Sequence, residues 1–257
     1  MLSIAERHKY ILDKLDQYGF VRISEIAEEL GVTKVTIRKD LKILESRGLL
    51  YKVHGSARPA TQSIIERDLM TKSLLNREAK QRIAACALQL IADNDAIMIS
   101  AGSTTYALAE AIHDKRPTAA LNVVTPFLKV STLLNELDNV CVEQLGGRVY
   151  KKSFATFGTN ASLSLGNMVC STFFVGADGI DPDFGITTST IEEAQLSQKM
   201  MESALRTVVL ADSSKFGLHG FGRMASLEDV DIIITDDGVP TEMRKIIEEA
   251  GVELIIA

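Results

Sequence analysis

Short apolar runs recur along the carboxyl-terminal part of the chain, and helical patterns separate most of them. The runs cover residues 96–99, 122–125, 140–145, 172–175, 207–211, 231–235 and 252–256. The helical patterns include residues 105–113, 127–137, 191–204 and 240–249. Buried strands that alternate with helices favour a largely parallel sheet covered on both faces. We therefore predict an α/β fold for this part of the chain.

The amino-terminal sixty residues have a different organisation. Residues 4–17 predict one helix, and Ser24 is placed to cap a second, short helix over residues 26–30. Gly31 suits the left-handed end of that helix, and Thr33 is placed to cap a third one. Helix, short helix, tight turn and helix in this order is the helix-turn-helix arrangement.

The third helix has one apolar face and one basic face. Ile37, Leu41 and Leu44 recur at four- and three-residue steps and are expected to be buried. A helix that is packed on one side and basic on the other can lie in the major groove of DNA, although a basic helix considered alone is more often a solvated surface. The residues of this helix that we predict to contact DNA are Lys34, Val35, Thr36, Arg38, Lys39 and Lys42. Asp40 is expected to form an ion pair or a cap inside the module instead.

A hairpin follows the third helix. Residues 49–53 predict a strand, and His54 and Gly55 its turn, so the hairpin would form a wing whose His54 is a further candidate DNA contact. Residues 1–60 carry a net charge of +3, whereas the remainder of the chain carries −9. A basic module on an acidic body is the electrostatic pattern of a nucleic-acid-binding protein.

The loops that follow the predicted strands are the candidate ligand site, because ligands of parallel sheets bind at the carboxyl ends of strands. Residues 100–105 place Gly102 and several hydroxyl groups at the start of a helix, where free amides can hold an anion. Taken alone, such a turn is usually structural. Arg148 could clamp a phosphate or pair with a carboxylate, and Lys215 could bind an anion or be an ordinary solvated charge.

Length and composition limit the other possibilities. A chain of 257 residues has room for a small module and one larger domain. We predict a DNA-binding domain over residues 1–58, a linker or arm over 59–75 and a sensing domain over 76–257. The chain shows neither a membrane-spanning apolar run nor a signal-peptide pattern. Its three cysteines are far apart in the sequence. We expect a cytoplasmic protein without a metal ion or other cofactor.

The amino-terminal motif resembles that of a known family. Arg7, its spacing to Thr33, and the sequence of residues 36–41 are similar to the signature of the DeoR family of bacterial transcriptional regulators. This resemblance implies a winged helix-turn-helix followed by a mostly parallel α/β effector domain that resembles sugar-phosphate isomerases. Residues 176–181 and 231–237 look most like those of galactitol and glucitol operon repressors.

The resemblance also implies a set of effector-binding residues in the second domain. The positions that match are Gly102, Ser103, Thr104, Thr105, Asp178, Thr187, Thr188, Glu193 and Lys215, to which the loop position of Arg148 adds one more candidate. Three residues depart from the family pattern: Ser100, Pro126 and Ser197 stand where Asp, Asn and Lys are usual.

The leading hypothesis is a DNA-binding regulator that represses a sugar or polyol utilisation operon and is relieved by a phosphorylated carbohydrate. Its partners would be double-stranded operator DNA, the phosphorylated sugar or polyol, and further copies of itself in a dimer or tetramer. One alternative is an isomerase-like enzyme in which Glu193 or Asp178 is the base. Another is a DNA-binding protein that responds to no small molecule.

Overall fold

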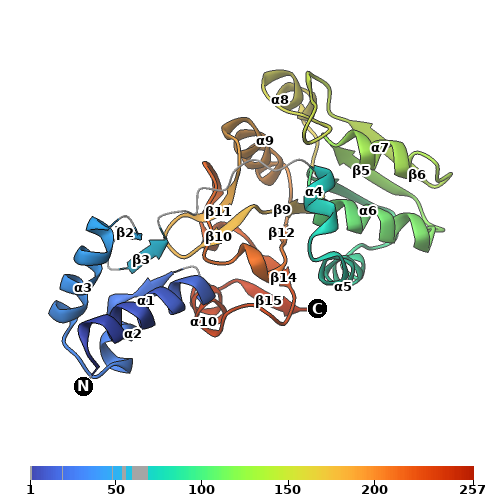
Figure 1. Ribbon diagram of the computed structural model, residues 1–257. Coiled ribbons are helices and arrows are strands. Elements are labelled where there is room, and N and C mark those ends of the chain that lie inside the picture. The colour runs from blue at the N-terminus through green and yellow to red at the C-terminus, as the bar shows by residue number, and fades with distance from the viewer. Residues whose placement is uncertain (1, 19, 48, 54–55, 60–68) are drawn as a thin grey trace. The chain divides into compact units, whose positions relative to one another are not determined.

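The computed structural model describes residues 2–18, 20–47, 49–53, 56–59 and 69–257 (Figure 1). The chain forms two compact units. One consists of Met1–Ser63 with Phe216–Leu218, and the other of Ile64–Lys215 with His219–Ala257.

The amino-terminal unit contains the predicted helix-turn-helix and a small antiparallel sheet. Its helices are α1 (Ile4–Tyr18), α2 (Ile23–Glu29) and α3 (Lys34–Ser46). Its strands are β1 (Val21–Arg22), β2 (Leu50–Val53) and β3 (Ser56–Pro59), in the order β1-β3-β2. Strands β2 and β3 pair antiparallel, which confirms the predicted hairpin. Its turn, with the candidate DNA contact His54, lies outside the described residues.

The ends of α2 and α3 test three predicted signals. Gly31 adopts φ +60°, and the Thr33 side chain accepts a hydrogen bond from the Thr36 amide at 3.2 Å, so both predictions are confirmed. The prediction that Ser24 caps α2 is wrong. The N-cap is Arg22, and Ser24 lies inside the helix. The reason is that β1 pairs with β3, with Arg22 opposite Ser56, so the chain passes directly from a strand into the helix.

Apolar burial and one charged cluster hold this unit together. Ile37, Leu41 and Leu44 of α3 are buried as predicted. Asp40, on the same helix, accepts hydrogen bonds from Arg7 Nε at 2.8 Å and Arg7 Nη2 at 3.1 Å, and lies 3.2 Å from His8 Nε2. The expected role of Asp40 as an ion-pair partner inside the module is therefore confirmed.

The second unit is built on a seven-stranded, fully parallel sheet with the order β15-β14-β12-β9-β4-β5-β6. The strands are β4 (Asp95–Ile99), β5 (Leu121–Thr125), β6 (Val140–Gln144), β9 (Thr172–Gly176), β12 (Thr207–Leu210), β14 (Ile232–Thr235) and β15 (Glu253–Ile256). They correspond to the seven predicted runs. Consecutive residues Ile97, Met98 and Ile99 are all fully buried, so both faces of the sheet are covered at its centre.

Helices follow most of these strands, and the predicted ones are confirmed with shifts at their ends. The helices of this unit are α4 (Leu69–Leu74), α5 (Arg77–Leu88), α6 (Ser103–Lys115), α7 (Leu128–Leu134), α8 (Thr159–Leu165), α9 (Ile191–Glu202) and α10 (Thr241–Glu249). Short 3-10 turns are η1 (Ser213–Lys215) and η2 (Leu227–Asp229). None of the described helices is long and apolar enough to cross a membrane.

Two small antiparallel sheets were not predicted from the sequence. One contains β10 (Gly179–Asp181), β11 (Gly185–Thr188) and β13 (Gly222–Ala225) in that order. The other pairs β7 (Val149–Tyr150) with β8 (Ala155–Thr156). Their strands are two to four residues long, too short to show a hydrophobic period.

Replacing Leu41 by Ala should destabilise the amino-terminal unit by roughly 2–5 kcal/mol, because a fully buried side chain is truncated and a cavity remains. The control is Val35→Ala on the same helix, where the side chain is 57% exposed and the change should stay within about 0.5 kcal/mol. Urea denaturation of the two variants provides the comparison. Equal loss of stability in both would contradict the burial of this face.

Candidate functional site

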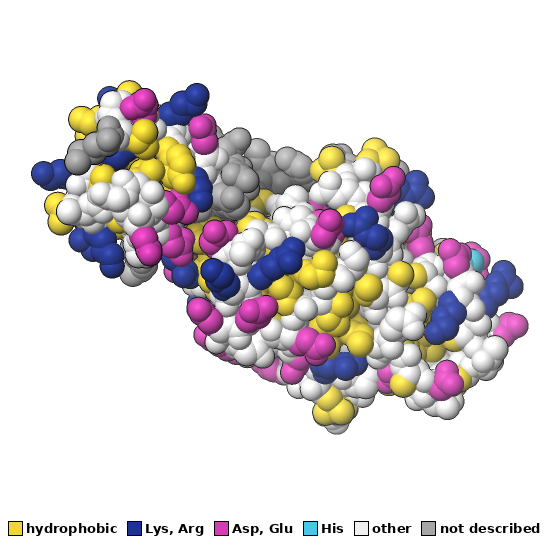
Figure 2. Space-filling view, turned by 90° about the horizontal axis from the view of Figure 1, so that it is seen from below, with side chains coloured by type: hydrophobic (Ala, Val, Ile, Leu, Met, Phe, Trp, Pro, Cys, Tyr) yellow, Lys and Arg dark blue, Asp and Glu magenta, His cyan; other side chains and the backbone are white. Residues whose placement is uncertain are grey.

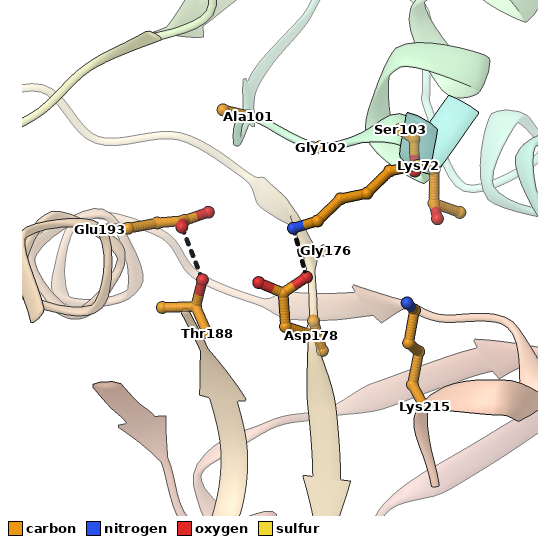
Figure 3. Close-up of a pocket in the computed structure, with 11 residues that line it drawn as sticks. Lys72, Ala101, Gly102, Ser103, Gly176, Asp178, Thr188, Glu193 and Lys215 are labelled. Carbon is orange, nitrogen blue, oxygen red and sulfur yellow. Dashed lines mark hydrogen bonds and ion pairs between the residues drawn. The ribbon is translucent and has the colours of Figure 1, made fainter. Parts of the chain in front are cut away.

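A pocket lies where several strands of the parallel sheet end. Residues that follow β4, β9 and β12 line it, together with residues from β11, α9 and α4 (Figure 3). The lining residues are Lys72, Ala101, Gly102, Ser103, Thr104, Gly176, Ala177, Asp178, Thr188, Glu193 and Lys215. Loops far apart in the sequence thus meet at the carboxyl ends of the strands, as expected for a parallel sheet.

The start of α6 supplies the part of the pocket that is best suited to an anion. Gly102 is the N-cap of this 13-residue helix, and no side chain caps the first amides. Free amides at a helix start attract negative groups, because the helix dipole adds to their hydrogen-bonding capacity. Ser103 and Thr104 face the pocket beside them. The Thr105 hydroxyl instead donates to the Ser100 carbonyl at 2.8 Å and the Gly102 carbonyl at 3.1 Å, which holds the turn in shape.

Asp178, only 8% exposed, is a buried acid of the pocket. Its Oδ1 accepts a hydrogen bond from Lys72 Nζ at 2.6 Å, and its Oδ2 accepts from the Ser189 amide at 3.1 Å and from the Ser189 hydroxyl. Burial disfavours ionisation of this carboxyl. The charge and hydrogen bond of Lys72, helped by Ser189 and Lys215, outweigh burial and hold the pKa of Asp178 below its ordinary value.

A second carboxylate faces the pocket from the start of α9. Thr190 caps this helix by accepting a hydrogen bond from the Glu193 amide at 3.3 Å. The Glu193 carboxylate accepts from the Thr188 hydroxyl at 2.6 Å, the other contact drawn in Figure 3. Together with Asp178, Glu193 gives the pocket two groups that can accept hydrogen bonds from ligand hydroxyls.

Lys215 supplies a cation at the opposite side of the pocket. It ends η1, the turn that follows β12, and Figure 3 shows its side chain beside Asp178. Within the described residues it forms no ion pair with a carboxylate. Buried Asp212 stabilises this turn. It accepts hydrogen bonds from Asn76 Nδ2 at 2.7 Å and the Ser214 amide at 3.2 Å.

Three of the predicted effector residues do not line the pocket. Besides Thr105, Thr187 is buried, and its hydroxyl donates to the Gly179 carbonyl and accepts from the Gly220 amide, so it joins the strands of the small sheet. Arg148 is exposed and lies outside the pocket. It follows β6, the edge strand of the large sheet, whereas the pocket forms near the central strands.

The sequence did not point to Lys72 or Ser189. Lys72 lies 106 residues before its partner Asp178, in the segment that the sequence predicts only as a linker or arm. No motif or spacing connects the two. Ser189 directly follows Thr188, so it lies one position beyond the effector residues that the resemblance implies.

A second candidate site is the basic face of α3. Lys34, Val35, Arg38, Lys39 and Lys42 are exposed, and Thr36 is half-buried beside the N-cap Thr33. In the part of Figure 2 that shows the amino-terminal unit, at the left, Lys and Arg side chains stand out from the surface. Since Ile37, Leu41 and Leu44 are buried, the helix presents one packed and one basic face, the geometry that groove binding requires.

Comparison with known proteins identifies the family. The sequence matches the DeoR-like helix-turn-helix domain over residues 7–63 and the DeoR C terminal sensor domain over residues 75–237. The chain belongs to the DeoR family of transcriptional regulators. A candidate aga operon transcriptional repressor of Escherichia coli O157:H7 is 32% identical over 98% of this chain and 93% of its own.

Two further relatives are similar to the chain over nearly its whole length. The regulator GlpR of Haloferax volcanii is 32% identical over 98% of this chain and 97% of its own, and UlaR of Shigella sonnei is 29% identical over 99% of both. Among solved structures, ribose 5 phosphate isomerase A from Neisseria gonorrhoeae matches with a TM-score of 0.39 at 19% identity, covering 53% of this chain and 52% of that one.

The lowered pKa of Asp178 predicts a specific pH dependence. Its ionised form is stabilised by folding, so this contribution is present above the unfolded carboxyl pKa of about 3.9 and is lost as the pH falls through the lower folded pKa. Asp178→Asn should lack this loss, so its stability should fall less steeply with acid than that of the wild type. Urea midpoints of both proteins, measured from neutral pH down to below the unfolded carboxyl pKa, test this difference in steepness. The control is Asp237→Asn, at an exposed aspartate, which should keep the wild-type steepness.

Proposed function

We propose that this regulator represses an operon for the use of a sugar or polyol, and that a phosphorylated form of such a carbohydrate releases it from operator DNA. The observation that carries the proposal is the pocket, which combines an uncapped helix start and two lysines with two carboxylates. We place its action in the cytoplasm, with residues 1–58 binding DNA, 76–257 sensing the effector and 59–75 connecting them.

The chemistry of the pocket suits a ligand with an anionic end and a polyhydroxylated end. The helix start at Gly102–Thr104 and the cation of Lys215 favour a phosphate. The carboxylates of Asp178 and Glu193 would repel a purely anionic ligand but accept hydrogen bonds from hydroxyl groups. A sugar or polyol phosphate meets both requirements. The relative described as a candidate aga operon repressor supports the assignment to an operon regulator.

Catalysis is a weaker explanation of the same residues. A base that removes a carbon-bound proton works best with a pKa near the working pH, whereas the ion pair with Lys72 holds the pKa of Asp178 below the ordinary carboxyl value. This weighs against Asp178 as a base, and the family that the chain matches consists of transcriptional regulators, so we propose that the pocket binds its ligand without converting it. Conversion of a phosphorylated sugar by the purified protein would contradict this part of the proposal.

The basic face of α3 yields a prediction for DNA binding. Lys39→Ala and Lys42→Ala should each weaken binding to all duplexes and reduce the salt slope by about one unit, because a phosphate contact is lost. Arg38→Ala should cost roughly 1–3 kcal/mol and relax specificity at one base pair. Fluorescence anisotropy with an operator selected by the protein from random duplexes provides the measurement.

The control for these variants is Lys9→Ala, an exposed lysine on α1 that we do not assign to the DNA surface. It should leave both affinity and salt slope near the wild-type values. Wild-type operator binding by both Arg38→Ala and Lys39→Ala would rule out α3 as the recognition helix.

Thr104→Val tests the phosphate site. It removes a hydroxyl beside the α6 start while nearly preserving side-chain volume. Hydrogen bonds to charged groups contribute about 1.5–3 kcal/mol, so affinity for the phosphorylated effector should fall roughly tenfold or more. Operator affinity without effector should not change. Isothermal titration with a panel of hexose and hexitol phosphates and their unphosphorylated parents measures this. Equal wild-type affinity for a phosphate ester and its parent would remove the phosphate from the proposal.

We also propose that the regulator acts as a dimer or a larger assembly. One winged module makes few base contacts, and symmetric pairs commonly read two half-sites separated by a helical turn. Sedimentation at micromolar concentration should therefore show an oligomer. A monomer both alone and on operator DNA would be inconsistent with it.

A further inference from the structure

Lys72 differs from the other pocket residues in its position along the chain. Of the described residues that line the pocket, it alone precedes the parallel sheet. It is carried by α4, the first described element after β3 of the amino-terminal unit. Figure 3 shows its side chain extending from the Ser103 side of the pocket to Asp178, where Nζ meets Oδ1 at 2.6 Å. The segment predicted to connect the two domains thus supplies a charge to the pocket.

Helix α4 is fastened to the sensing unit at both ends. At its start, the Leu69 amide donates to the Lys152 carbonyl at 3.0 Å, and the Leu69 side chain is buried. At its end, Lys80 Nζ donates to the carbonyls of Lys72 and Leu75, both at 2.6 Å. Lys80 is only 4% exposed, so it is a buried charge that supports the residue whose side chain enters the pocket. The Lys72 side chain is therefore carried by a helix whose position is fixed by its own contacts.

The pocket is nearly full as it stands. Its cavity volume is about 30 Å³, which suffices for a water molecule but not for a small-molecule ligand, whose pockets typically measure about 300–1,000 Å³. The Lys72 side chain crosses this space to reach Asp178. A sugar phosphate can enter only if pocket groups rearrange, and the ion pair between Lys72 and Asp178 stands in its way.

The charges indicate how the rearrangement would proceed. An entering phosphate brings negative charge next to the carboxylate of Asp178. A cation must therefore move closer to the phosphate to offset the repulsion between the two. The Lys72 stem begins on the Ser103 side of the pocket, close to the helix start that we assign to the phosphate. Hydroxyl groups of the ligand can replace Lys72 as hydrogen-bond donors to Asp178.

We propose that Lys72, carried by the connecting arm, is an effector-binding residue. When the pocket fills, Lys72 leaves Asp178 and pairs with the ligand's phosphate. Since the ion pair with Asp178 is one of the contacts that hold α4 in place, its loss on ligand binding loosens the arm that leads to the DNA-binding unit. This inference rests on the proposed function, since it requires that the pocket binds a phosphorylated carbohydrate.

The test uses the full-length protein with inorganic phosphate as the probe and amide hydrogen exchange as the readout, at constant ionic strength. Phosphate should protect residues 100–106 in the wild type and make residues 69–75 exchange severalfold faster, because Lys72 leaves Asp178. Lys72→Met should lower the affinity for phosphate about tenfold, measured by the phosphate concentration that protects residues 100–106. Lys72→Arg should restore most of it. Lys199→Met, at an exposed lysine of α9, is the matched control and should bind as the wild type does.

Asp178→Asn gives a second variant with the opposite expected sign. It removes the group that competes with phosphate for Lys72, so phosphate should bind more tightly than to the wild type. This comparison does not depend on the folding of Lys72→Met.

The outcomes separate the two proposals. Protection of residues 100–106 with no change at 69–75, or wild-type phosphate affinity in Lys72→Met, would overturn the role of Lys72 alone. If neither phosphate nor any of a panel of phosphorylated sugars protects residues 100–106 in the wild type, the proposed function fails, and this inference fails with it.

Discussion

Parallel pairing of seven strands is the constraint on which the sensing unit depends. Because β4, β9 and β12 run in the same direction side by side, the loops after them must meet at one edge of the sheet. That edge joins the α6 helix start, Asp178 and Lys215, which come from three separate parts of the sequence. The small sheet of β10, β11 and β13 then adds Thr188, and α9 adds Glu193 beside it. Site geometry here is a consequence of topology.

Each of the two units also contains a buried aspartate that is paired with a basic side chain from a distant part of the sequence. Asp40 joins α3 to Arg7 and His8 of α1, and Asp178, which directly precedes β10, pairs with Lys72 of α4. Removing one member of a buried ion pair leaves an unpaired charge, so such pairs specify which elements must lie together. In the first unit the pair fixes a recognition scaffold. In the second it crosses the pocket, so a ligand of the kind that we propose would compete with it.

The parts of the site that could be predicted share a local signal. Gly102 to Thr104 combine a strand end with a helix start, and Glu193 follows a threonine that caps its helix. In both cases a few consecutive residues are enough to predict the position. Thr105 and Thr187 have the residue type expected of ligand contacts, but their hydroxyls are used by backbone groups that the fold brings to them. Lys72 could not be predicted, because its partner lies 106 residues away and lysines in arms are usually solvated.

By itself the sequence determined the helix-turn-helix, the seven strands of the large sheet and the family, because hydrophobic period, capping residues and short motifs are local properties of the chain. It also determined the basic face of α3, since the apolar positions specify which side is packed. Only the tertiary structure decided which polar side chains face the pocket and which are used to hold loops in place. That distinction depends on contacts between residues far apart in the sequence, and the pairing of Lys72 with Asp178 is its clearest case.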